Sequence, residues 1–178
     1  MASELGPGKL LVLQYHSGDK YATPETEAKV KEYNVKGFPT IFFNGGNSVV
    51  GGGSGNYAQY STVVNSELTK QSSVSIVGAM TLSGGTLSLN VTVTNISGSA
   101  ITNVKLMAVL YSDYGTEEHH YVVRDILPPS NIASLSAGET QKFSLSSDFR
   151  DSLSSLRAVL FVQSSSGQIL QSAIATTQ

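Results

Sequence analysis

Two imidazoles and two carboxylates stand together at one place in the sequence, Glu117-Glu118-His119-His120. Histidine nitrogen and carboxylate oxygen can both bind zinc or a similar ion. Adjacent residues of a strand point to opposite faces, so His119 and His120 would face opposite ways, each on the same face as one glutamate. One face then offers two ligands at best, and a third would have to come from elsewhere, such as Asp113. We expect the solvated start of a strand here, with His119 and His120 as weak candidate metal ligands and no cofactor.

His16 and Asp19 follow a continuous apolar run, Leu10–His16. Such a run is typical of a strand buried on both faces of a parallel sheet. Open α/β sheets bind ligands beyond the ends of their strands, which makes His16 and Asp19 candidate binding residues. The nearby Ser17 belongs to no recognisable nucleophile motif. We therefore expect a polar strand end here and no catalytic pair.

Pro39 stands at the head of an apolar segment, Thr40–Asn44, that is expected to be a strand. Proline gives up a ladder hydrogen bond and is seldom tolerated there. The cis peptide form costs little only before proline, so the bond between Phe38 and Pro39 is a good candidate for it. Phe38, Pro39 and Thr40 are candidate binding residues; the alternative is a proline that only shapes the entry into the strand.

Composition excludes several classes of function. The chain has no cysteine, which excludes disulfides, thiol catalysis and thiolate metal sites. Eleven basic and 13 acidic residues leave a net charge of −2, which argues against nucleic acid as a partner. No apolar run approaches the ~20 residues of a membrane span. The first residues contain no apolar signal core, so an export signal would have to lie upstream.

The sequence changes character near residues 70–73, where we place a boundary between segments 1–72 and 73–178. In the first segment, Thr23-Pro24-Glu25 starts a helix that runs to about Tyr33, because it combines a capping hydroxyl, a proline and an acidic first turn. Thr40–Asn44 and Ser48–Val50 are predicted to form a hairpin across a turn rich in Asn and Gly. A last helix is expected over about Tyr57–Lys70.

The first segment resembles the thioredoxin superfamily over roughly residues 9–71. The similarity is carried by the string Glu32-Tyr33-Asn34-Val35-Lys36-Gly37-Phe38-Pro39-Thr40-Ile41-Phe42-Phe43 and by the order strand, helix, strand, strand, helix. In that superfamily such a proline is cis and faces a redox-active Cys-x-x-Cys. The segments Tyr15–Asp19 and Tyr21–Glu25 narrow the resemblance to bacterial envelope proteins of the Omp28 type, which join a thioredoxin-like region to a β-sandwich.

The resemblance implies a first half, with a central strand and the Cys-x-x-Cys helix, that this sequence does not contain. The expected strands at 10–16 and 40–44 would both flank that central strand. They must then pair with each other, accept a strand from another chain, or leave open edges, and an open apolar edge promotes association. We expect either direct closure of the two strands or self-association as a dimer or by strand exchange.

The second segment contains seven predicted strands: Val74–Leu82, Thr86–Asn95, Thr102–Ser112, Glu118–Leu127, Thr140–Ser146, Leu156–Gln163 and Ile169–Thr176. Alternation is plainest in Leu87–Asn95, where Leu87, Leu89, Val91 and Val93 should face a core. The strand spacing and an Ala137-Gly138-Glu139 turn resemble immunoglobulin-like or fibronectin-III-like modules of bacterial surface proteins. The expected fold is therefore an α+β chain in two parts, a truncated thioredoxin-like α/β segment followed by an immunoglobulin-like antiparallel β-sandwich.

Taken together, the sequence favours a non-catalytic binding or structural module of a bacterial cell-envelope or secreted protein. A protein partner or self-association is expected, without nucleic acid and without a membrane span. The alternative is the C-terminal portion of a thioredoxin-like thiol–disulfide oxidoreductase whose Cys-x-x-Cys lies in a missing N-terminal segment. Disulfide exchange cannot proceed within this chain, because the attacking group is a thiolate.

Overall fold

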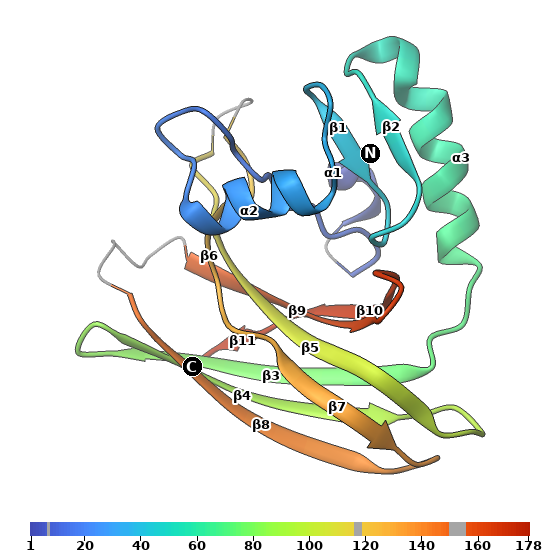
Figure 1. The fold of residues 1–178 in the computed structure, drawn as a ribbon, viewed down its shortest axis with the longest axis vertical. Coiled ribbons are helices and arrows are strands. Elements are labelled where there is room, and N and C mark those ends of the chain that lie inside the picture. The colour runs from blue at the N-terminus through green and yellow to red at the C-terminus, as the bar shows by residue number, and fades with distance from the viewer. Residues whose placement is uncertain (7, 116–118, 150–155) are drawn as a thin grey trace.

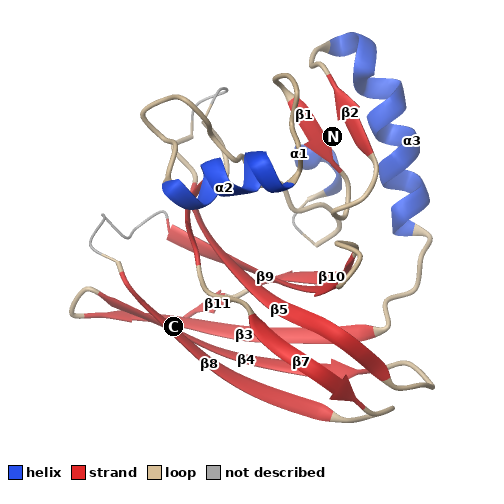
Figure 2. Cartoon of the chain, viewed as in Figure 1, coloured by secondary structure: helices blue, strands red, loops and turns tan. Residues whose placement is uncertain are grey.

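The computed structural model describes residues 1–6, 8–115, 119–149 and 156–178. The chain is a mixed α+β structure in two parts, and strands make up most of it (Figures 1 and 2). The first part contains α1 Ala2–Leu5, α2 Pro24–Glu32, β1 Thr40–Phe42, β2 Ser48–Val50, the 3-10 turn η1 Ser54–Asn56 and α3 Tyr57–Leu68. It lies over one face of the second part, which consists of two sheets.

Helix α2 begins where the sequence predicted. The Thr23 side chain accepts a hydrogen bond from the Thr26 N–H (3.3 Å), and the Thr26 hydroxyl accepts one from the Thr23 N–H (2.9 Å). This reciprocal capping box satisfies two backbone donors that the first turn leaves unpaired, and Pro24 occupies the first turn at no cost in hydrogen bonds.

The predicted hairpin is also present. β1 and β2 are antiparallel, with Ile41 opposite Val49. Asn44 (φ 48°) and Gly45 (φ 72°) both have positive φ, and the Gly46 N–H donates to the Phe43 carbonyl at 3.0 Å. Two central residues with positive φ are typical of the tight turns whose twist matches that of paired strands.

The segment Leu10–His16 is not a strand of a parallel sheet, and this corrects the prediction. It is extended and makes one isolated parallel bridge, between Gln14 and Val122. The Gln14 N–H donates to the Tyr121 carbonyl (2.9 Å), and the Val123 N–H donates to the Gln14 carbonyl (3.0 Å). The segment therefore pairs with the second part of the chain and does not close directly onto β1.

The second part is a sandwich of two sheets. One sheet has the order β11-β3-β4-β8, and the other has the order β10-β9-β5-β6, with β7 also paired to β5. The strands are β3 Val74–Ser83, β4 Thr86–Asn95, β5 Ile101–Ser112, β6 Val122–Ile126, β7 Ser130–Leu135, β8 Thr140–Asp148, β9 Leu156–Ser164, β10 Ile169–Ile174 and β11 Thr176–Thr177.

The main core lies between these two sheets, as the alternation in β4 predicted. Leu87, Leu89, Val91 and Val93 are at most 1% exposed and belong to one apolar cluster with residues of β5 and β9, among them Leu106 and Leu160. The polar residues between them point away from this core.

Three strand assignments differ from the sequence prediction. The strand expected at Glu118–Leu127 begins at Val122, and Glu117 and Glu118 lie outside the described residues. β7 was not predicted, because its buried residues Ile132 and Leu135 are three positions apart and break the alternation. The last expected strand is divided, since β10 pairs with β9 whereas β11 pairs in parallel with β3.

A second apolar layer joins the two parts of the chain. The outer face of the β5–β9 sheet carries buried Met107, Val109, Tyr111, Val159 and Phe161. Leu11, Leu13 and Tyr15, alternate residues of the extended N-terminal segment, pack against this layer. The sheet is therefore apolar on both faces, and the first part of the chain covers the outer one. None of the helices in the described part of the chain is long and apolar enough to cross a membrane.

Candidate functional site

The residues Phe38, Pro39 and Thr40 lie at the end of the β1–β2 hairpin. The Phe38–Pro39 peptide bond is cis. Phe38 is 64% exposed, and Val50, which is paired with Thr40 across the hairpin, is 66% exposed. The Thr40 hydroxyl donates to the Gly37 carbonyl at 2.6 Å, so it holds the turn that precedes the strand. Phe38, exposed Pro39 and Val50 together form an apolar surface, which we call the hairpin surface.

One edge of this hairpin is unpaired. Among the described strands, β2 is the only partner of β1. The Pro39 carbonyl accepts from the Gly51 N–H (2.8 Å), and the Phe43 N–H donates toward β2, to Asn47 (2.9 Å). Because bonding direction alternates along an antiparallel strand, the backbone groups of Thr40 and Phe42 point away from β2.

The structure brings His16 and Asp19 together in one turn. His16 Nδ1 and Asp19 Oδ2 are 2.6 Å apart, and Asp19 Oδ1 accepts from the Tyr21 N–H (2.8 Å). The hydrogen bond with His16 is the main cause that lowers the pKa of Asp19. Ser17 donates instead to Glu27, at 2.9 Å. Asp19 therefore organises a turn. The pair does not lie at the end of a parallel sheet, since the segment before it makes one isolated bridge, between Gln14 and Val122.

His119 and His120 diverge, as adjacent residues should. His120 Nδ1 is 2.8 Å from Asp113 Oδ1, so the carboxylate considered as a third metal ligand is hydrogen-bonded to His120. His119 instead contacts His16 and Tyr21, with ring centroids 5.7 and 4.6 Å away. Within the described residues, no group of three or more His, Cys, Asp or Glu side chains is placed to hold a metal ion.

The neighbourhood of His16 and His119 was not foreseen from the sequence. The bridge between Gln14 and Val122 places these two histidines side by side, although they are more than a hundred residues apart in the chain. No local pattern encodes such a pairing, since it depends on where the N-terminal segment docks.

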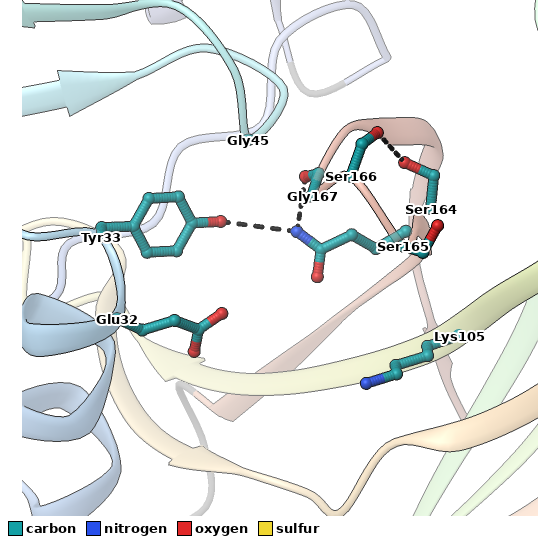
Figure 3. A pocket seen from close by; sticks show the side chains of 9 residues that line it. Glu32, Tyr33, Gly45, Lys105, Ser164, Ser165, Ser166 and Gly167 are labelled. Atoms are coloured by element: carbon teal, nitrogen blue, oxygen red, sulfur yellow. Dashed lines mark hydrogen bonds between the residues drawn. The ribbon is translucent and has the colours of Figure 1, made fainter.

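A polar pocket of about 320 Å³ lies at the junction of the two parts (Figure 3). Its lining comes from four separate segments: Glu32 and Tyr33 at the end of α2, Gly45 in the hairpin turn, Lys105 of β5, and residues 163–167 at the end of β9 and in the turn after it. Sequence reasoning missed this pocket, because no motif links these four segments and only the docked arrangement brings them together.

Two close backbone approaches form one wall of the pocket. A Cβ atom on Gly45 would overlap the Gly167 carbonyl oxygen, so only glycine fits there. Next to this contact the Ile169 N–H donates to the Asn44 carbonyl at 2.8 Å. The Gln163 side-chain amide donates to the Gly167 carbonyl (2.6 Å) and reaches the Tyr33 hydroxyl (3.4 Å).

Comparison with known proteins indicates a shared fold. No family model matches the sequence, and no curated protein matches it. The solved structure of HBP35 of Porphyromonas gingivalis is 13% identical, with a TM-score of 0.71 over 92% of this chain and 62% of that chain. A domain of the outer membrane lipoprotein Omp28 from Porphyromonas gingivalis is 10% identical, with a TM-score of 0.47 over 61% of this chain and 93% of that chain.

The similarity to HBP35 extends over both parts of the chain, and it shows that the two proteins share a fold. This chain spans 62% of the length of the HBP35 structure. A β-glucosidase 3B from Thermotoga neapolitana is similar over 58% of this chain and 15% of its own, with 15% identity and a TM-score of 0.39.

Proposed function

We propose that this chain is a non-catalytic protein-binding module of a bacterial cell-envelope or secreted protein. The observation that carries the proposal is the open edge of β1, where the backbone groups of Thr40 and Phe42 point outward, with exposed Phe38 just before the strand and exposed Val50 across the hairpin. An extended peptide can add a strand to such an edge, with main-chain hydrogen bonds for affinity and apolar contacts for specificity.

The α/β part is a partial thioredoxin-like unit in this proposal, and the sandwich is an immunoglobulin-like unit. The sandwich assignment is supported by the pairing of β3, β4 and β8 in one sheet opposite β5, β9 and β10 in the other. That division corresponds to strands A, B and E opposite C, F and G in immunoglobulin-like sandwiches. The envelope location is based on the Omp28-type resemblance of residues 15–25, and the fold shared with HBP35, a bacterial protein, agrees with it.

The occupant of the β1 edge is an extended segment of another protein. A second copy of this chain is the other possible occupant, and it would produce a dimer at the same edge. The redox alternative, a C-terminal portion of a thiol–disulfide oxidoreductase, would require cysteines from outside this sequence. The cis Phe38–Pro39 bond is compatible with both readings and does not distinguish them.

Peptide selection followed by NMR mapping tests the proposal. Random linear peptides displayed on phage would be selected on the immobilised protein, and a selected peptide titrated into the ¹⁵N-labelled chain. We expect the amide signals of Thr40 and Phe42 to shift most. Failure to select any peptide, or shifts confined to the β-sandwich, would contradict the proposal.

A pair of valine variants provides the control. Val50→Lys adds a charge to the hairpin surface, across β1 from the open edge, and should weaken peptide binding ~5-fold, the loss expected for an interface residue whose change costs about 1 kcal/mol. Val77→Lys changes a valine of β3 with nearly the same exposure (67%, against 66% for Val50) and should leave binding unchanged. Light scattering of both variants distinguishes the second-copy occupant, because only a dimer formed at the hairpin would be lost in Val50→Lys.

A further inference from the structure

We infer that the pocket between the two parts binds a small zwitterion of amino-acid or dipeptide size, with its carboxylate at Lys105 and its ammonium group at Glu32. This site is separate from the hairpin surface and does not depend on the proposed function. Its volume of about 320 Å³ is at the lower end of the range typical of small-ligand pockets.

The two opposite charges of the pocket come from different parts of the chain. Glu32 ends helix α2, whereas Lys105 projects from the outer face of β5. Figure 3 shows both side chains extending toward the same space. In the described portion of the chain they form no ion pair with each other, so a ligand that carries both charges can lie between them.

Each of the two charged groups has an atom that can still bind a ligand. Glu32 Oε2 is 2.7 Å from Lys29 Nζ, and Oε1 has no hydrogen-bond partner among the residues that the structure describes. Lys105 likewise has no ion-pair partner within the described ranges, and its neighbours Val104 and Leu106 are buried, which fixes the position of its backbone.

The rest of the lining is polar and suits a small hydrophilic molecule. The β9–β10 turn contributes Ser164, Ser165 and Ser166, and the Tyr33 hydroxyl lies on the other side (Figure 3). Ser164 and Ser166 are hydrogen-bonded to each other at 2.8 Å, which orders the turn. Hydroxyl groups can donate or accept, so they can satisfy the remaining polar atoms of the ligand.

The charge pattern selects against other ligand classes. A simple cation would be repelled by Lys105, and a simple anion would meet Lys105 but leave Glu32 Oε1 without a new partner. An apolar ligand would displace water from Glu32 and Lys105 without replacing its hydrogen bonds. A zwitterion meets both charges with the correct sign.

Titration with a matched ligand series tests this inference by NMR. The probes are glycyl-alanine, its N-acetyl derivative without the ammonium group, and its C-terminal amide without the carboxylate. We expect glycyl-alanine to shift the amide signals of Gly45, Ser165 and Ser166, and each modified probe to bind up to ~5-fold more weakly, the upper value for one exposed ion pair. Equal binding of all three probes, or no shift with glycyl-alanine or free alanine, would overturn the inference.

Charge-removing variants distinguish the pocket from general surface binding. Lys105→Met and Glu32→Gln keep the size of the side chain and should each weaken glycyl-alanine binding by the same ~5-fold. Lys142→Met, on the exposed face of β8, is the control and should have no effect. Binding that survives in both pocket variants, or preferential shifts with an uncharged sugar such as glucose, would exclude the zwitterion.

Discussion

Replacing Gly45 with alanine should loosen the α/β part from the β-sandwich. Gly45 has a φ of 72°, in the left-handed region that L residues avoid. Its missing side chain also leaves space for the Gly167 backbone, since an added Cβ would overlap the Gly167 carbonyl oxygen and lie 3.3 Å from Gln163 Nε2. A side chain can move away from such an overlap, but a backbone carbonyl held in a turn cannot do so without moving the turn.

The expected cost follows from these two effects. A non-glycine residue in the left-handed region costs ~1–2 kcal/mol. Separation of the two turns would also break the hydrogen bond from the Ile169 N–H to the Asn44 carbonyl, which contributes ~0.5–1.5 kcal/mol. We therefore expect Gly45→Ala to reduce the free energy of docking by ~1.5–3.5 kcal/mol.

Amide hydrogen exchange at Ile169 measures this loss directly. A decrease of ~2 kcal/mol in the free energy of opening corresponds to exchange that is ~30-fold faster. Gly46→Ala is the matched control in the same turn, because an added Cβ there lies 3.7 Å from the nearest atom, the Phe43 carbonyl oxygen, which is an ordinary contact. Unchanged exchange at Ile169 in Gly45→Ala, or an equal acceleration in Gly46→Ala, would refute the reasoning.

Three further predictions concern stability. Burial raises the pKa of Tyr15, so the folded state keeps the phenol proton that the unfolded chain loses near pH ~10. The stabilisation that comes from this retained proton is complete below pH ~10 and is lost as the pH rises above it. Tyr15→Phe should therefore flatten the fall of the unfolding free energy, measured with denaturant, between pH ~9 and ~11. Asn95→Ala should lower the free energy of unfolding by ~2–4 kcal/mol, because the buried amide donates to the Leu135 carbonyl at 2.8 Å. A urea midpoint equal to that of the parent protein would contradict this prediction. Gly78→Ala should lower the free energy of unfolding by ~1–3 kcal/mol, since the added Cβ would overlap the Leu160 side chain between the sheets. A higher thermal unfolding temperature in this variant would instead show that the core has spare room.

Local features of the chain were predictable because their causes are local. Thr23 and Thr26 cap each other within one turn, so the start of α2 could be read from three neighbouring residues. Asn44 and Gly45 tolerate positive φ, which made the hairpin turn evident. The strict alternation of Leu87 and its neighbours identified both the strand β4 and the face that packs into the core.

Other features could not be predicted, since they depend on contacts between distant segments. The apolar run Leu10–His16 was expected to be a strand of a parallel sheet, closed onto the hairpin strand or completed by self-association. Instead, Leu11, Leu13 and Tyr15 pack on the outer face of the β5–β9 sheet, an apolar surface that a single sequence does not reveal. β7 was missed for a related reason: its pairing with β5 compensates for an irregular pattern of buried residues.

The sequence by itself determined the type and approximate limits of most elements, the absence of thiol chemistry, and the candidate residues Phe38, Pro39 and Thr40 at the head of β1. Only the tertiary structure decided which of these elements meet: His16 beside His119, Gly45 against Gly167, and Glu32 together with Lys105 at one pocket. The physical reason is that backbone propensity and capping act over a few neighbouring residues, whereas docking depends on the apolar area and polar pairing available across the whole folded chain.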